Sequence, residues 1–151
     1  MKLELRQQAF DPYAELSAYQ AAMDRHGQYG ATASFVGTMR DFNDGEQIEG
    51  MTLEYYPGMT EKHLRGICLQ VGQHWTILDV LVIHRVGQIE TGEPIVVVAV
   101  WSAHRGDAFD ACRYIMEELK QTAPFWKKEK LADGERWVEK NTDGYTGKPP
   151  N

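Results

Sequence analysis

The sequence predicts a single-domain α+β fold of mixed α/β character, with a mixed, largely antiparallel sheet and about three helices. Apolar runs with strand character, such as residues 31–39 and 94–102, alternate along the chain with segments whose apolar side chains recur at helical spacing. The 151 residues correspond to one domain. No internal repeat, low-complexity segment or long Pro/Gly/Ser stretch divides the sequence into further domains.

The first half of the chain alternates strands with helices. We predict strands at residues 1–8, 31–39 and 48–56, and helices at about 11–25 and 60–75. Asp11 suits a helix N-cap and Pro12 suits the first helical turn, so the first helix begins there. A polar loop at 40–45 follows the second strand, and we expect the third strand to be its partner.

The second half predicts a helix flanked by strands. The strands cover residues 76–86, 94–102 and 135–138, and the helix covers about 107–121. Pro124 ends this helix, and a short aromatic and basic segment follows at 125–130. We place the domain at residues 1–140 and expect 141–151, rich in Gly, Pro and polar residues, to be a flexible tail.

Composition excludes several classes of protein. Sixteen Lys and Arg against 22 Asp and Glu give a net charge of −6, unlike a protein that binds nucleic acid over its whole surface. No apolar run approaches the roughly 20 residues of a membrane helix, and the N-terminus lacks the apolar core of a signal peptide. Two cysteines are too few for a disulfide scaffold, so we expect a cytoplasmic protein.

His104 and Arg105 form the first candidate site. They fall between the buried strand and the N-terminus of the following helix, where unpaired backbone N–H groups and the helix dipole favour an anion. An Arg and a titratable His at that point suggest a bound phosphate or carboxylate. The alternative is a solvated Arg105 with His104 merely ending the strand, and spacing alone favours that alternative.

Lys120 lies on the shoulder of its helix's apolar stripe. At about 100° per residue it falls beside Phe109 and Met116, which we assign to the stripe, and away from the solvent face. Such a lysine either extends its amine to solvent, the commoner outcome, or is partly desolvated, which lowers its pKa. The rigid Pro-Phe-Trp-Lys-Lys segment at 124–128 adds Lys127 and Lys128 nearby. We expect Arg40, His104, Arg105, Lys120 and Lys127 to line one concave pocket.

Other chemistries lack their motifs in this sequence. The five histidines form no HxH or HExxH pair and there is no CxxC, so we predict no metal site. No phosphate-binding GxxxxGK[ST], GxGxxG or GxSxG motif occurs. Cys68 and Cys112 lie on the apolar stripes of their helices and are predicted core residues. Any activity should therefore rest on Lys, Arg and His acting on an anionic substrate.

Five motifs together resemble the large, catalytic subunit of molybdopterin synthase. They occur in that family's order over nearly the whole chain. The motifs are Tyr-Tyr-Pro-Gly-Met-Thr-Glu-Lys (55–62), Val-Ile-His-Arg-Val-Gly (82–87), Ser-Ala-His-Arg (102–105), Leu-Lys…Ala-Pro-Phe-Trp-Lys-Lys-Glu (119–129) and Gly-Glu-Arg-Trp-Val-Glu (134–139).

The resemblance implies an α/β hammerhead-like fold, a homodimer, and one small ubiquitin-like sulfur-carrier subunit bound at each outer end of it. The carrier's C-terminal Gly-Gly, as a thiocarboxylate, enters the pocket and delivers sulfur to cyclic pyranopterin monophosphate. Two transfers form the dithiolene of molybdopterin, so the implied function is sulfur transfer in molybdenum cofactor biosynthesis, with no cofactor of the enzyme's own, no nucleic acid and no membrane.

The resemblance also implies roles for single residues. Lys120 and Lys127 resemble the two essential lysines, which serve proton transfer, adduct stabilisation and opening of the cyclic phosphate. The implied substrate-binding residues are Thr38, Met39, Arg40, His104, Arg105, Lys120, Lys127, Lys128 and Glu129. Thr38 stands where relatives often carry a basic residue, so only its backbone contact is expected to persist. A non-catalytic adaptor for a ubiquitin-like tail and a generic transferase for phosphate ligands stay as alternatives.

Overall fold

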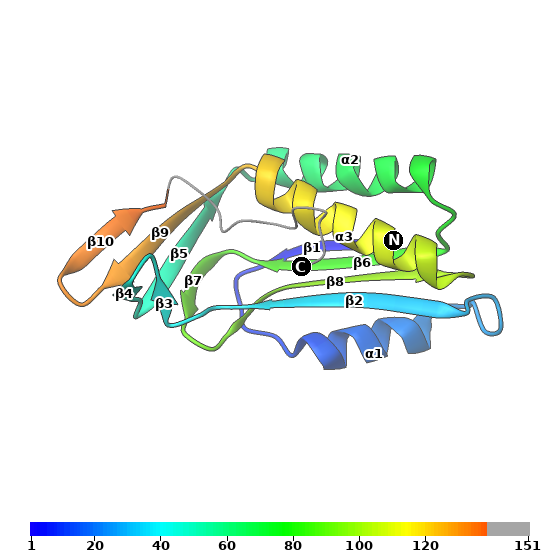
Figure 1. Ribbon diagram of the computed structural model, residues 1–151, viewed down its shortest axis with the longest axis horizontal. Coiled ribbons are helices and arrows are strands. Elements are labelled where there is room, and N and C mark those ends of the chain that lie inside the picture. Colours follow the sequence, from blue (N-terminus) through cyan, green and yellow to red (C-terminus); the bar gives the residue numbers. More distant parts are fainter. Residues whose placement is uncertain (139–151) are drawn as a thin grey trace, which may run out of the picture.

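The computed structural model describes residues 1–138, and its largest element is a four-stranded sheet with helices on both faces (Figure 1). Strands β1 and β6 run parallel, whereas β6–β8 and β8–β2 are antiparallel. In spatial order the strands are β1 (Lys2–Arg6), β6 (Asp79–Arg85), β8 (Pro94–Ser102) and β2 (Ala31–Thr38).

The helices cover this sheet unequally. Helix α1 (Pro12–Ala22) lies on one face, and α2 (Met59–His74) and α3 (Arg105–Thr122) lie side by side on the other (Figure 1). Side chains alternate between the faces of a strand, so Val80 and Val82 of β6 pack toward α2 and α3 while Leu81 packs toward α1. This central strand is therefore apolar on both sides.

A second, antiparallel sheet stands beyond one end of the first (Figure 1). Its outer side is exposed, and its inner side packs on Met39, Ile48 and Ile95. In spatial order its strands are β10 (Gly134–Trp137), β9 (Phe125–Leu131), β5 (Gly50–Tyr55) and β7 (Gly87–Glu90), and the hairpin β3 (Phe42–Asn43) with β4 (Glu46–Gln47) lies beside it.

The predicted α+β class with three helices and a largely antiparallel, mixed arrangement is confirmed, but the strands form two main sheets. The strand predicted at 48–56 was expected to pair with 31–39; it pairs instead with β7 and β9. The segment at 125–130, predicted as a short connection, is strand β9, and the polar loop at 40–45 contains part of a hairpin. These pairings join distant segments, so local sequence patterns did not reveal them.

Helix boundaries follow the sequence signals closely. Asp11 caps α1 by accepting hydrogen bonds from the backbone N–H groups of Tyr13 and Ala14. Phe109 was wrongly assigned to the buried stripe of α3: it is 66% exposed, and Ala111 takes its place in the core. Within residues 1–138 no helix is long and apolar enough to span a membrane. The end of the predicted domain near 140 and the predicted tail at 141–151 lie outside the described residues.

Candidate functional site

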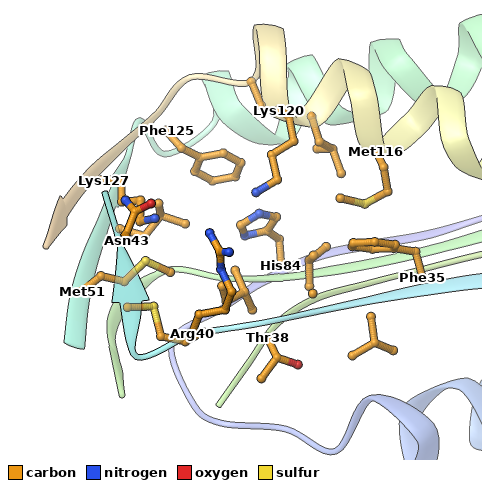
Figure 2. A pocket seen from close by; sticks show the side chains of 18 of the residues that line it. Phe35, Thr38, Arg40, Asn43, Met51, His84, Met116, Lys120, Phe125 and Lys127 are labelled. Carbon is orange, nitrogen blue, oxygen red and sulfur yellow. The ribbon is translucent and has the colours of Figure 1, made fainter. Parts of the chain in front are cut away.

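A cavity of about 500 Å³ opens where the two sheets meet the C-terminal end of α3 (Figure 2). This volume lies in the range typical of small-molecule sites. The walls combine apolar side chains, among them Phe35, Met51 and Met116, with a few charged groups. Arg40, Lys120 and Lys127 all line it, so three of the five side chains expected in one pocket come together.

Arg40 reaches the cavity because β2 changes course at its end. The register of β2 against β8 shifts between Gly37 and Thr38, a β-bulge that re-aims the residues beyond it. A Cβ on Gly37 would lie 2.9 Å from Val96 Cγ1, so a larger residue here would require the Val96 side chain to shift. The Met39 N–H donates to the Glu93 carbonyl (2.9 Å), which fixes the backbone just before Arg40.

Lys120 enters the cavity from the last turn of α3. Its side chain as a whole is exposed, but it also lines the cavity, and the groups around the amine partly desolvate it. This desolvation, followed by the charges of Lys127 and Arg40, lowers the pKa of Lys120 below its usual 10.5. A lowered pKa makes it easier for this lysine to release a proton, so it can exchange protons with a substrate.

Lys127 is held by a buried carboxylate. Its Nζ lies 3.2 Å from Oε1 of Glu129, a side chain with no exposed surface. Asn43 Nδ2 donates to the same oxygen at 2.7 Å, and Arg136 Nε donates to Oε2 at 3.0 Å. Burial alone would raise the pKa of Glu129, but the donors from Asn43, Lys127 and Arg136 lower it overall. The carboxylate therefore stays charged and keeps Lys127 in place.

His104 and Arg105 do not reach this cavity. Both are exposed at the opposite end of α3, where His104 is the N-cap residue without a side-chain cap bond. At 1.5 Å per residue, Arg105 and Lys120 stand about 22 Å apart along the helix axis. The expectation that all five side chains line one pocket is therefore wrong within a single chain, and their substrate-binding role stays a prediction.

Lys128 lies on the other face of β9 from Lys127 and Glu129, as strand alternation requires. Its Nζ lies 2.9 Å from Oε2 of Glu135 and 5.2 Å from the centre of the Trp137 ring. Thr38 and Met39 line the cavity, as does Glu129. The substrate-binding roles expected for these residues also stay predictions.

Sequence reasoning missed three residues of the site. Asn43 and Arg136 hold Glu129 from distant parts of the chain, and no local pattern indicates this. His84 also lines the cavity. Its position at two-residue spacing after Val80 and Val82 could have placed it on the α3 side of β6.

The arrangement suits an anionic substrate that brings its own reactive atom. Both cysteines are buried, and burial raises the pKa of Cys68 to about 12 and that of Cys112 to about 11, so neither is a thiolate near neutral pH. Residues 1–138 contain no group of three or more His, Cys, Asp or Glu side chains placed to hold a metal. The groups that remain can bind negative charge and move protons.

Residues 6–122 match the family described as MoaE protein. The chain belongs to the MoaE protein family. A Pseudomonas aeruginosa relative named molybdopterin synthase catalytic subunit is 52% identical over 139 residues, covering 92% of this chain and 91% of the relative.

Solved structures of MoaE relatives share the fold. The molybdopterin biosynthesis MoaE protein from Burkholderia ambifaria has a TM-score of 0.77 and 46% identity, with 94% of this chain and 92% of that chain covered. The molybdopterin synthase from Staphylococcus aureus has a TM-score of 0.79 and 30% identity, with 91% and 98% covered. The resemblance noted from the sequence motifs is thereby confirmed.

Proposed function

We propose that this chain is the catalytic subunit of a molybdopterin synthase. It transfers sulfur from the C-terminal thiocarboxylate of a small ubiquitin-like carrier subunit to cyclic pyranopterin monophosphate. The observation that carries this proposal is the pocket itself, where Arg40, Lys120 and Lys127 surround a cavity and the only two thiols of the chain are buried elsewhere. Sulfur must then arrive on a partner, as a thiocarboxylate provides.

The three cations have different roles because their environments differ. Lys127 is paired with the buried Glu129 carboxylate and stays positioned to bind an anion, either the thiocarboxylate or the substrate phosphate. Arg40 adds a second, forked donor suited to phosphate. Lys120, with its lowered pKa, takes up and returns protons.

The sulfur step balances without an oxidant. The thiocarboxylate sulfur forms a bond to an oxygenated substrate carbon while the carbon–oxygen bond there breaks, and that oxygen leaves as water or with the opened phosphate. Water then cleaves the acyl–sulfur bond, which leaves the sulfur on the substrate and a carboxylate on the carrier. Negative charge develops on the acyl oxygen during that cleavage, and the fixed cations of the pocket stabilise it. A second carrier repeats the transfer to complete the dithiolene.

His104 and Arg105 enter this proposal through a second copy of the chain. Because one helix length separates them from the cavity of their own chain, they contact that substrate only across a homodimer. The Pseudomonas aeruginosa relative is named a catalytic subunit, which implies a second, non-catalytic subunit. This name supports the carrier as a partner of the chain. We place the enzyme in the cytoplasm, where both unpaired cysteines stay reduced.

The deciding experiment incubates the chain with thiocarboxylated carrier and cyclic pyranopterin monophosphate and follows the dithiolene product. We expect product with the wild-type chain and none with a carrier that ends in a carboxylate. Tight carrier binding without product would instead support the adaptor alternative. Turnover of an unrelated phosphate ester without carrier would support a generic transferase.

A further inference from the structure

Within residues 1–138, His84 is the one neutral titratable side chain that lines the cavity, and the proposed mechanism gives it no task. It lies at the end of β6 on the side that faces α3, and only 9% of it is exposed. Figure 2 shows its imidazole beside the Lys120 amine. The two groups interact electrostatically, since the charge of Lys120 acts on the protonation of His84.

The backbone determines which nitrogen of His84 faces the cavity. Nδ1 lies 2.7 Å from the carbonyl oxygen of Arg85. A carbonyl oxygen can only accept, so Nδ1 carries the proton and donates it. The ring also stacks on Phe125, with centroids 4.4 Å apart and planes at 19°, and this contact helps to hold its orientation. The neutral ring therefore presents a bare Nε2, a hydrogen-bond acceptor, in the pocket.

Burial, and after it the charge of Lys120, keep the ring neutral. Three cations share the cavity with it: Lys120 from α3, Lys127 from β9 and Arg40 from the end of β2. Two carboxylates, those of Glu117 and Glu129, also line the cavity. Burial, and after it the Lys120 charge, lower the pKa of His84 to about 4 despite the favourable hydrogen bond to Arg85. At neutral pH the imidazole is an acceptor among cations that can only donate.

We propose that His84 is a positioning residue for Lys120: the lysine amine donates a hydrogen bond to the bare Nε2 and is thereby held toward the substrate. The inference rests on the proposed sulfur transfer, since that reaction is what gives Lys120 its task. A flexible lysine gains most from such an anchor, because its four-carbon stem otherwise samples many rotamers.

Two amide substitutions separate this role from a structural one. His84→Asn places an N–H near the position of Nδ1 and can keep the bond to the Arg85 carbonyl, but it loses the acceptor at Nε2. His84→Gln places a carbonyl oxygen near Nε2 but gives up the backbone bond. Both variants lose the stacking on Phe125, so they form a matched pair.

We expect kcat for dithiolene formation to fall by up to about 100-fold in His84→Asn and less in His84→Gln, with KM and carrier affinity little changed in both. Thermal unfolding should show the opposite order, with the Asn variant the more stable of the two. Equal rates, or activity that follows stability, would overturn the proposal.

Nitrogen-15 NMR of the histidine ring tests the same contact without substrate. We expect the Nδ1–H tautomer of His84 in the wild-type chain, and a changed Nε2 resonance in Lys120→Ala. An Nε2–H tautomer, or an Nε2 resonance that is unchanged in Lys120→Ala, would overturn the inference even if sulfur transfer proceeds. The expected NMR signature together with no sulfur transfer would instead contradict the proposed function and leave the contact established.

Discussion

The two ends of helix α3 both carry cations, yet they have different surroundings. At the C-terminal end Lys120 opens into a cavity that Lys127 and Arg40 also line. At the N-terminal end His104 and Arg105 stand exposed on the surface of the chain. The helix dipole alone would favour an anion at the N-terminal end and a cation at the other. A site for anions formed at the C-terminal end because neighbouring strands supply walls and further cations there.

This contrast shows what turns basic residues into a site. Lys127 is held by Glu129, which is itself held by Asn43 and Arg136. Exposed charged side chains are less restrained, and their interactions contribute little electrostatic free energy. Desolvation, together with repulsion from Lys127 and Arg40, also lowers the pKa of Lys120. The N-terminal end has the residue types of a site, and in a single chain it lacks the enclosure.

The largest effect should follow loss of Lys120. Lys120→Ala should lower sulfur transfer by about 10²–10⁴-fold because a positioned proton-transfer group disappears. Alanine favours the helix, so folding and carrier binding should persist. Lys120→Arg should restore little activity, since guanidinium stays protonated. The measurement is product formation at saturating carrier with a parallel binding titration; near wild-type turnover would show that the catalytic lysine is a different one.

Mixed dimers test whether the exposed end of α3 completes a pocket in a second copy. His104→Ala/Arg105→Ala should raise KM by about 10–100-fold through lost charged hydrogen bonds. At substrate concentrations well below the wild-type KM, mixing this chain with Lys120→Ala should recover roughly a quarter of wild-type activity, because half of random dimers are mixed and each has one intact site. If the mixture is no more active than either variant alone, the N-terminal end of α3 does not complete the pocket of a second copy.

Removing the Glu129 charge should destabilise the fold around the cavity at the C-terminal end of α3. In Glu129→Gln the Lys127 and Arg136 cations lose their shared counter-ion, and we expect about 1–3 kcal/mol of lost stability together with weaker substrate binding. Glu135→Gln is the matched control, because its carboxylate is 57% exposed and pairs with Lys128 on the outer face. Urea unfolding measures both variants; equal losses would show that burial of Glu129 adds nothing.

Acid should weaken the protein through His84 and Glu129. The folded pKa of His84 is about 4 against an ordinary 6.5, so unfolded chains bind the extra proton and stability falls as pH drops from 6.5 toward 4. That difference corresponds to a loss on the order of 3 kcal/mol. Glu129, whose pKa is lowered below 4.5, adds a further loss under more acidic conditions. Urea unfolding across this range should show the fall, and His84→Gln should flatten it between pH 6.5 and 4.

The smallest effect is expected at Lys128. Its exposed pair with Glu135 lies on the face of β9 away from the cavity, so Lys128→Ala should change stability by less than about 0.5 kcal/mol. KM for the pterin substrate tests the substrate-binding role of Lys128, and a rise of less than about twofold, worth less than 0.5 kcal/mol, would count against that role. A larger rise in KM would support the substrate-binding role implied by the family motif and would mean that this outer face takes part in the site.

Much of the site was predictable because its residues lie in motifs with local signals. The shoulder position of Lys120 follows from helical spacing, and Pro124 marks the end of the helix that presents it. The ambiguity was whether Lys120 extends into solvent or is desolvated, and helical spacing gives no information on what faces that shoulder. In the structure Lys120 is exposed as a whole, and its amine is still partly desolvated because strand β9 places Phe125 and Lys127 opposite it.

The sequence by itself determined the α+β class, the three helices and the family, since these depend on local periodicity, capping residues and ordered motifs. Only the tertiary structure decided that β5 joins β9 instead of β2, that Glu129 collects donors from Asn43 and Arg136, and that His104 lies a helix length from Lys120. The physical reason is distance along the chain. Backbone pairing between remote strands and burial of a shared carboxylate depend on the whole packed arrangement, which no short stretch of sequence contains.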